Sequence, residues 1–389
     1  MDETIAKERI LSPNYVLSCA ASFASFGNFY LLLATMPVFV LAVGGRESDV
    51  GLTMGIFSFT SMAVRPFVSK ATYGVGTYGV GMKWLMIGGA AAMSASSASY
   101  VLAQTVPVLF AIRLLQGIGW GVISTACLAL VASISPASRR GEAMGLYGMF
   151  GSIAMAVGPA LGIFLASSYG FTAVFLSSAA VACLALATSL AVVDPAPRAL
   201  PSGAKPKPAS VFHTRLLVPS LIVFITGVTY SALVYFLPLV ATGQGIDNPG
   251  LFFTIYAIVV VVFRGPLGRA SDIWGRVAVI APGLVAGAMG LALISQSVTL
   301  PTLLAVAFLY GFHFAAVQPT LMAWSIDRVG SSESGAAAGA FALSMDLGIS
   351  VGGFFWGFVA QSAGFGNMYL AAATLHIIAL GILLVGRRR

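Results

Sequence analysis

The sequence predicts an all-α membrane protein with twelve transmembrane helices in two pseudo-symmetric six-helix bundles. First, hydrophobic residues make up 58% of the chain and charged residues 8%, whereas a soluble domain carries about 25% charged residues. Second, the apolar residues form runs of about 20, the length that crosses a bilayer as a helix. Third, the two halves of the sequence repeat. The runs must be helices because lipid leaves unpaired backbone groups without partners, and no pattern of short alternating strands is visible.

The expected spans follow one another along the chain. The first follows a charged stretch, residues 1–12, and we read it as a retained span because no signal-peptide cleavage site followed by soluble sequence is visible. Lys and Arg gather on the connections that one orientation places in the cytoplasm, which puts both termini inside. This bias explains the net charge of +8 without a nucleic-acid partner. The twelve expected spans are residues 15–41, 50–68, 84–103, 107–133, 143–167, 171–193, 215–241, 250–268, 277–296, 301–324, 337–361 and 366–386.

A linker divides the chain into two units. Residues 194–214 are rich in Pro, Ser and Lys and lack apolar periodicity. They separate an N-terminal bundle, residues 1–193, from a C-terminal bundle, residues 215–389. Arg65 matches Arg264 at an offset of 199, and from the third span onward the matches are 194 apart. The difference equals one unit of the tandem TYGVGTYGVG at residues 72–81, which we read as a tolerated insertion in the loop after span 2.

Three motifs carry a resemblance to a known family. Residues 268–276 read Gly-Arg-Ala-Ser-Asp-Ile-Trp-Gly-Arg and follow span 8. Residues 113–119 in span 4 read Arg-Leu-Leu-Gln-Gly-Ile-Gly, and residues 158–162 in span 5 read Gly-Pro-Ala-Leu-Gly. These motifs resemble those of the major facilitator superfamily, and the resemblance covers essentially the whole chain.

The resemblance implies a gating role for several residues. In the family the loop motif latches the cytoplasmic side of the outward-facing state, and the Gly-Pro signature of span 5 is enriched in proton-driven exporters. The alternative for that Gly-Pro pair is a simple packing kink. The first-half loop motif departs from the pattern because Ser69 replaces its glycine, and Tyr73 or Tyr78 replaces its aspartate. The expected gating residues are Arg65, Arg264, Asp272, Arg276, Gly158 and Pro159.

Two charged residues lie deep in the expected spans. A charge at the bilayer centre costs about 2.5–3.5 kcal/mol on insertion scales, so each needs a reason. Asp346 lies in span 11, where a carboxylate should bind a proton readily and release it when its surroundings hydrate. Arg113 belongs to the span 4 motif that the family links to proton coupling. We assign proton coupling to Asp346 and Arg113; the alternative for Asp346 is a protonated carboxyl in one helix–helix hydrogen bond.

The resemblance also implies a central cavity lined by spans 1, 4, 7 and 10. Polar and aromatic groups on these spans are candidates for substrate binding, with ordinary interhelical bonding as the alternative. His313 could instead relay protons, and we expect His376 to face lipid or a neighbouring helix. The sparse charge argues against a phosphate ester or a sodium site. The expected substrate-binding residues are Asn28, Tyr30, Gln116, Tyr230, Tyr235, Tyr310, His313 and Gln318.

The sequence therefore predicts a secondary active transporter of the inner membrane. We expect proton-coupled efflux of a small organic or amphipathic compound by alternating access, in a lipid-embedded monomer that needs no cofactor other than the proton gradient. The alternative is a proton symporter importing a sugar, organic acid or similar metabolite; a non-transporting receptor would require a soluble appendage for its partner. No catalytic triad, metal-ligand spacing of the three cysteines or ATP-binding loop is visible, which argues against an enzyme.

Overall fold

The computed structural model describes residues 10–73, 81–136, 139–193, 214–296, 298–330 and 333–386. Within these ranges the chain is helical and has no strand, which confirms the all-α fold class. Most of the predicted linker and residues 74–80 of the TYGVG tandem lie outside the described residues.

The first half of the chain contains six long helices. Local sequence sets the start of the first one, because Ser12 accepts a hydrogen bond from Tyr15 N and Pro13 occupies the first turn. A glycine, Gly170 at φ 81°, separates the last two. The helices are α1 (Pro13–Ala42), α2 (Glu47–Tyr73), α3 (Met82–Ser99), α4 (Val106–Ile134), α5 (Arg140–Tyr169) and α6 (Phe171–Ala191), with the short 3₁₀ helix η1 (Tyr100–Leu102) after α3.

The second half repeats this series after a short 3₁₀ helix, η3 (Thr214–Leu216). Its long helices are α7 (Leu217–Gly243), α8 (Leu251–Trp274), α9 (Arg276–Ile294), α10 (Leu300–Val329) and α11 (Ser334–Gly386). The last helix consists of two helical stretches that meet at Gly364, whose φ of 81° suits glycine and breaks the helix. In the described part of the chain, ten helices are long and apolar enough to cross a membrane, with α11 counted once and the more polar α2 excluded.

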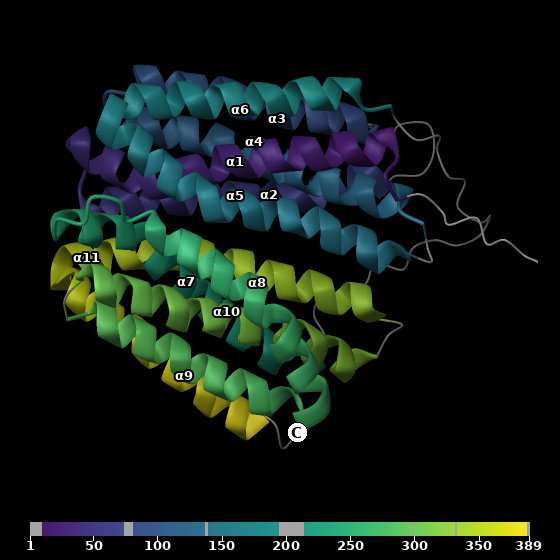
Figure 1. Cartoon of the computed structure of the whole chain (residues 1–389), viewed down its shortest axis with the longest axis vertical. Coiled ribbons are helices and arrows are strands. Elements are labelled where there is room, and N and C mark those ends of the chain that lie inside the picture. The colour runs from purple at the N-terminus through teal and green to yellow at the C-terminus, as the bar shows by residue number, and fades with distance from the viewer. Residues whose placement is uncertain are drawn as a thin grey trace, which may run out of the picture.

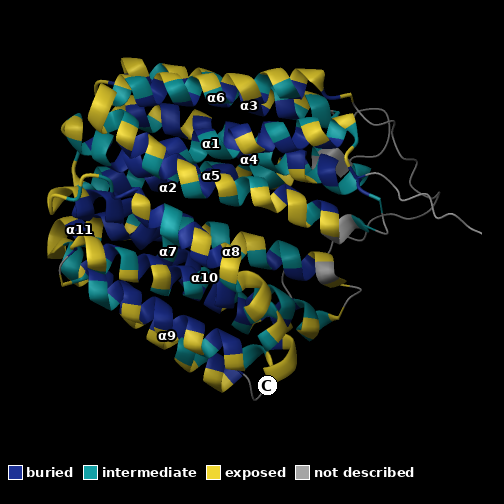
Figure 2. Cartoon of the chain, in the orientation of Figure 1, coloured by how far each residue is buried: buried dark blue, intermediate teal, exposed yellow. Residues whose placement is uncertain are grey.

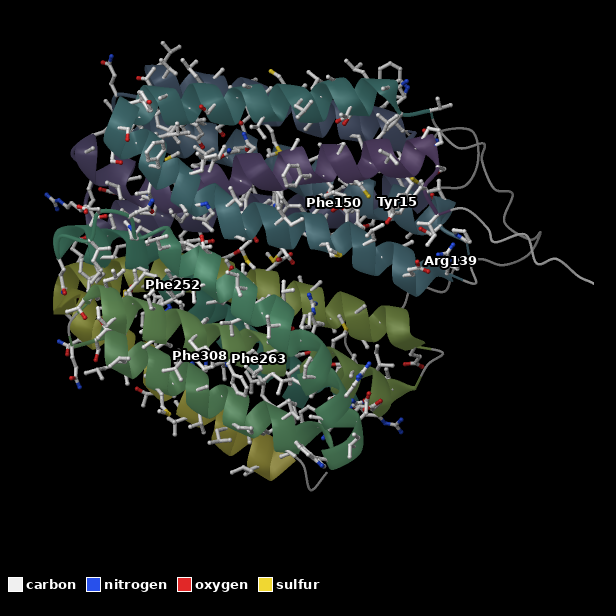
Figure 3. The ribbon with its side chains drawn as sticks, viewed as in Figure 1. Tyr15, Arg139, Phe150, Phe252, Phe263 and Phe308 are labelled. Atoms are coloured by element: carbon white, nitrogen blue, oxygen red, sulfur yellow. The ribbon has the colours of Figure 1, made fainter. Side chains whose placement is uncertain are left out.

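The two halves lie side by side, with α1–α6 in one layer of the view and α7–α11 in the other (Figure 1). Within the first half, α1 packs against α4, α5 and α6, and within the second α7 packs against α11. Aromatic contacts such as Phe263 of α8 with Phe308 of α10, whose ring centroids are 5.9 Å apart, join helices within a half (Figure 3). Buried residues gather on the inner faces of the helices and exposed ones on the outside (Figure 2).

The most extensive contacts between the halves are made by two helix pairs, α2 with α11 and α5 with α8, and α7 also contacts α1 and α2. We call the end of the molecule near Pro13 and Gly386 the terminal end, and the opposite end the distal end. The tightest approaches lie toward the distal end: a Cβ placed on Gly357 of α11 would come within 2.9 Å of Gly51 Cα on α2. Between α8 and α5, Thr254 donates a hydrogen bond of 2.5 Å to Ala156 O.

Candidate functional site

A cavity of about 90 Å³ lies between the two halves. Helices α1, α2, α4, α7 and α11 line it, whereas the sequence led us to expect spans 1, 4, 7 and 10. Its walls are mostly aromatic and aliphatic, with the hydroxyl groups of two serines and two tyrosines and two opposite charges. The lining residues are Phe29, Leu33, Phe57, Ser58, Ser61, Arg65, Trp120, Tyr230, Val234, Tyr235, Asp346 and Ile349.

An ion pair crosses this cavity from one half to the other. Arg65 Nε lies 3.3 Å from Asp346 Oδ2, and the two side chains are 35% and 25% exposed. The Arg65 Nε–H nevertheless has no hydrogen-bond partner, so the pair is held by charge rather than by an aligned hydrogen bond. Both groups can therefore be reached by a molecule in the cavity, and neither is locked in place.

Helix geometry brings these two side chains together. Arg65 lies on α2 and Asp346 on α11, the two helices that approach closely through Gly51 and Gly357 nearer the distal end. Sequence reasoning assigned Arg65 to the loop motif after span 2 and did not expect it beside the cavity. Because α2 continues to Tyr73, Arg65 is a helical residue within the bundle. The available signal was the apolar run of span 2, residues 50–68, which already contained Arg65 and runs past Pro66.

Aromatic stacking builds the wall of the cavity in the first half. The Phe29 ring stacks on Trp120 at 5.0 Å and on Phe57 at 5.4 Å between centroids. Across from it, Tyr235 of α7 shares a hydrogen bond of 2.6 Å with Ser58 of α2. Two of the expected substrate-binding residues, Tyr230 and Tyr235, thus lie on the cavity wall.

The polar groups Asn28, Arg113 and Gln116 form a network inside the first half rather than a cavity surface. All three are at most 2% exposed. Arg113 Nη1 donates to Gln116 Oε1 at 2.9 Å, and Gln116 Nε2 donates to Asn28 Oδ1 at 3.3 Å. Within the described residues no carboxylate forms an ion pair with Arg113; its other Nη donates to Met54 Sδ at 3.1 Å. In this conformation Arg113 and Asp346 are therefore not paired.

The remaining expected substrate-binding residues lie away from the cavity lining in this conformation. Tyr310 is fully buried and donates to Thr229 Oγ1 at 3.4 Å, and Gln318 donates to Met345 Sδ at 3.1 Å. Tyr30 packs against Phe26 and Phe29 on α1.

Two histidines form a buried pair in the second half. His376 is fully buried, and its Nε2 lies 3.3 Å from Nε2 of His313. His313 Nδ1 lies 2.9 Å from Gly283 O. Of the two surroundings expected for His376, lipid and a neighbouring helix, the structure places it against the helix that carries His313.

The residues of the second-half loop motif, which the sequence predicts as gating residues, make contacts within the second half. Arg276 donates from Nε to Asp327 Oδ2 at 2.9 Å and also forms an ion pair with Asp272, so it ties the ends of α8 and α10 to the start of α9. Arg264, the repeat counterpart of Arg65, is exposed. In α5, Gly158 lets the helix pass close to Tyr30, and Pro159 lies beside Gly250 at the start of α8.

A second, apolar crevice of about 250 Å³ lies between α5 and α8. In the sequence repeat its residue Ser152 is the counterpart of Asp346, and Arg264 is the counterpart of Arg65. The ion pair therefore exists at the α2–α11 contact and has no carboxylate counterpart at the α5–α8 contact. The crevice is lined by Met149, Ser152, Ile153, Ala156, Ala257, Ile258, Val261 and Val262.

Comparisons with known proteins agree with this architecture. The model of the Major Facilitator Superfamily matches residues 18–252 and 220–389. The chain is 26% identical to the staphylopine export protein of Staphylococcus aureus over 86% of each chain. It is 23% identical to an uncharacterized MFS-type transporter of Methanocaldococcus jannaschii, over 95% of this chain and 96% of that one.

Two solved structures share the fold at low sequence identity. One is a bacterial homolog of the human lysosomal transporter Spinster, in an inward-facing and unoccupied conformation, with a TM-score of 0.80 at 12% identity over 98% of each chain. The other is the nucleoside transporter NupG, with a TM-score of 0.74 at 13% identity, over 97% of this chain and 99% of that one. At such identities the likeness shows the fold alone.

Proposed function

Because the chain belongs to the Major Facilitator Superfamily, we propose that it is a secondary active exporter that exchanges a small organic compound for protons by alternating access. We place it in the inner membrane as a monomer, with both termini in the cytoplasm and with the proton gradient as its only energy source. The two halves rock about the central cavity, which opens first to one side of the membrane and then to the other.

The observation that carries the proposal is the ion pair between Arg65 and Asp346. The two residues belong to different halves, line the cavity and lie 3.3 Å apart. A proton that binds Asp346 removes its charge and with it the attraction between α2 and α11. A substrate that reaches Asp346 competes for the same carboxylate. Proton and substrate therefore bias the same contact between the halves, which is the requirement for coupling their movements.

Export rather than import is supported by two observations. The relative from Staphylococcus aureus, 26% identical to this chain, is an export protein. The Gly158–Pro159 signature of α5 lies where that helix passes close to α1 and α8, so it can act as a bending point between the halves. We assign the role of Arg113 to holding the polar network of the first half, through which it tunes the position of α2 by way of Met54.

Inside-out membrane vesicles test the direction and the coupling. Labelled L-phenylalanine, tetraphenylphosphonium and succinate are offered to vesicles whose lumen is made acid, and uptake is followed with and without nigericin to collapse the pH gradient. Export by proton exchange predicts that at least one compound accumulates in the lumen and that nigericin abolishes this. Accumulation only in right-side-out vesicles, in the direction of proton entry, would instead establish the import alternative.

The variant Asp346→Asn separates proton coupling from transport itself. The amide cannot exchange a proton, so we expect downhill exchange of the compound to persist while accumulation driven by the pH gradient disappears. Arg46→Gln, an exposed residue outside the cavity, serves as the control and should keep full accumulation. If Asp346→Asn accumulated the compound as the unmodified protein does, Asp346 would have no part in coupling.

A further inference from the structure

The geometry of the cavity points to a substrate class: we propose that it binds small zwitterions of the amino-acid type, with an ammonium and a carboxylate on neighbouring atoms and an apolar or aromatic substituent. This inference rests on the proposed transport function, because it concerns the same cavity. It is carried by the charge balance of the cavity, by the spacing of its two charged groups and by its walls.

The two opposite charges of the cavity disfavour ligands that carry a single charge. The cavity holds one positive and one negative side chain, and a charge in a region of low dielectric is costly unless it is paired. A simple cation on Asp346 would leave Arg65 without its partner, and a simple anion on Arg65 would leave Asp346 without its partner. A zwitterion gives each side chain a new partner of opposite charge and adds no net charge, so it can engage both groups at once, which a singly charged ligand cannot.

The spacing of the two side chains sets the spacing of the charges in the ligand. Arg65 Nε and Asp346 Oδ2 are 3.3 Å apart, and their helices are held close at Gly51 and Gly357. A ligand with adjacent charges can bind both groups while α2 and α11 stay close together. A ligand with widely separated charges would require the two helices to move apart. The guanidinium of Arg65, whose side chain is 35% exposed, supplies donors for the carboxylate, and Asp346 accepts from the ammonium. An α-amino acid or its N-substituted derivative has this arrangement.

The walls set the character of the substituent. Phe29, Phe57 and Trp120 form a stacked aromatic cluster on one side, and Tyr230 lies on the other. The faces of aromatic rings favour contact with an apolar or aromatic group, and they also attract an ammonium group through cation–π interaction. The hydroxyl groups of Ser58 and Tyr235 already bond to each other at 2.6 Å, so they offer little to a sugar with many hydroxyl groups.

A matched set of three compounds tests the proposal in equilibrium binding to the purified full-length protein. L-Phenylalanine, 2-phenylethylamine and 3-phenylpropionate share the aromatic group and carry both charges, the positive charge alone and the negative charge alone. We expect L-phenylalanine to bind at least about tenfold more tightly than either other compound, because an unpaired buried charge costs that much or more.

Two variants should replace the preference for L-phenylalanine with a preference for one of the singly charged compounds, a different one in each variant. Arg65→Gln leaves Asp346 alone in the cavity, so the amine should become the tightest ligand. Asp346→Asn leaves Arg65 alone, so the carboxylate compound should become the tightest. These gains of binding cannot come from misfolding. The control Arg46→Gln should keep the original order of the three compounds.

The proposal is overturned if the unmodified protein binds none of the three compounds, or binds the amine or the carboxylate compound as tightly as L-phenylalanine. It is also overturned if neither variant changes the order. Binding is measured at equilibrium without a pH gradient, so its failure is distinct from failure of the proposed export. Zwitterion binding combined with gradient-independent transport would retain the substrate class and remove the proton exchange.

Discussion

The carboxylate of Asp346 lies beside the guanidinium of Arg65 at a depth where an isolated charge would be costly. Each group lowers the cost of the other, and each is still partly exposed to the cavity, at 25% and 35% of its side chain. A pair with this exposure is weaker than a fully buried one, since solvent screens it. That weakness suits a contact that has to break and form again in every transport cycle.

Asn28 has the opposite character, because it is fully buried and fully bonded. Its amide donates to Ser97 Oγ at 2.7 Å and to Ser178 Oγ at 2.7 Å, and its oxygen accepts from Gln116. It therefore joins α1 to α3, α4 and α6. A group with so many partners holds helices in place rather than meeting a mobile substrate.

Replacing Asn28 by Ala should consequently lower stability. The substitution leaves the Gln116 amide and two serine hydroxyls with fewer partners, and we expect a loss of about 1–3 kcal/mol in the free energy of unfolding. Unfolding in sodium dodecyl sulfate measures this change. Asn367→Ala is the control, because Asn367 is exposed and its amide donates to Ala363 O across the break at Gly364; equal losses in the two variants would contradict the role given to Asn28.

Part of the site could be predicted from the sequence at this scale. Tyr230 and Tyr235 were expected to bind substrate and Asp346 to couple protons, and the structure places all three on the cavity wall. Asn28 and Gln116 could not be assigned correctly to wall or interior, because a polar residue on a cavity-lining span can point either way and the sequence gives no rotation of the helix. Arg65 was expected as a gating residue of the loop motif and not as a cavity residue, although the expected span 50–68 already contained it.

Toward the distal end, helix α2 approaches α11 closely because glycines of the two helices, Gly51 on α2 and Gly357 on α11, face each other. A Cβ on Gly357 would lie 2.8 Å from Glu47 O and 2.9 Å from Gly51 Cα, closer than ordinary van der Waals contact allows. Backbone atoms cannot move aside as a flexible side chain can. This glycine contact therefore closes the distal end between the two halves in the present conformation.

The substitution Gly357→Ala should open the distal end. The added methyl group pushes α2 from α11, so the conformation closed at that end becomes less populated. A single cysteine placed at Ser61, a cavity-lining residue, should then react faster with a membrane-impermeant maleimide added from the distal side. Gly381→Ala, on the same long helix but with no atom near its added Cβ, is the control and should react at the original rate. Unchanged labelling in Gly357→Ala would show that the glycine contact does not limit access.

The helices themselves were predictable to within a few residues, and the exceptions have physical causes. The apolar run of span 2 was expected to end at residue 68, yet α2 continues to Tyr73 because a helix does not stop where charged residues begin. Spans 11 and 12 appear as one element, α11, because the turn between them is a single glycine at positive φ, Gly364. Apolar periodicity locates the membrane part of a helix but not its solvated ends.

The sequence repeat relates the two contacts between the halves, but the side chains at these contacts differ in charge. At the α2–α11 contact the halves share an ion pair, whereas at the related α5–α8 contact the place of Asp346 is taken by Ser152 in an apolar crevice. Of these two contacts between the halves, only the α2–α11 contact carries a carboxylate of this kind, so in the proposed mechanism protonation acts there. This asymmetry means that a single carboxylate can bias the whole molecule.

The central claim is that protonation of Asp346 loosens one half from the other. It is tested most directly by the distance between spin labels at Phe67 on α2 and Trp274 on α8, two exposed residues near the terminal end, measured by double electron–electron resonance in a cysteine-free protein. The account predicts that acidification shifts this distance distribution toward larger separations, and that Asp346→Asn shows the larger separations at every pH. A distribution that did not change with pH in the unmodified protein, or that changed equally in Asp346→Asn, would contradict it.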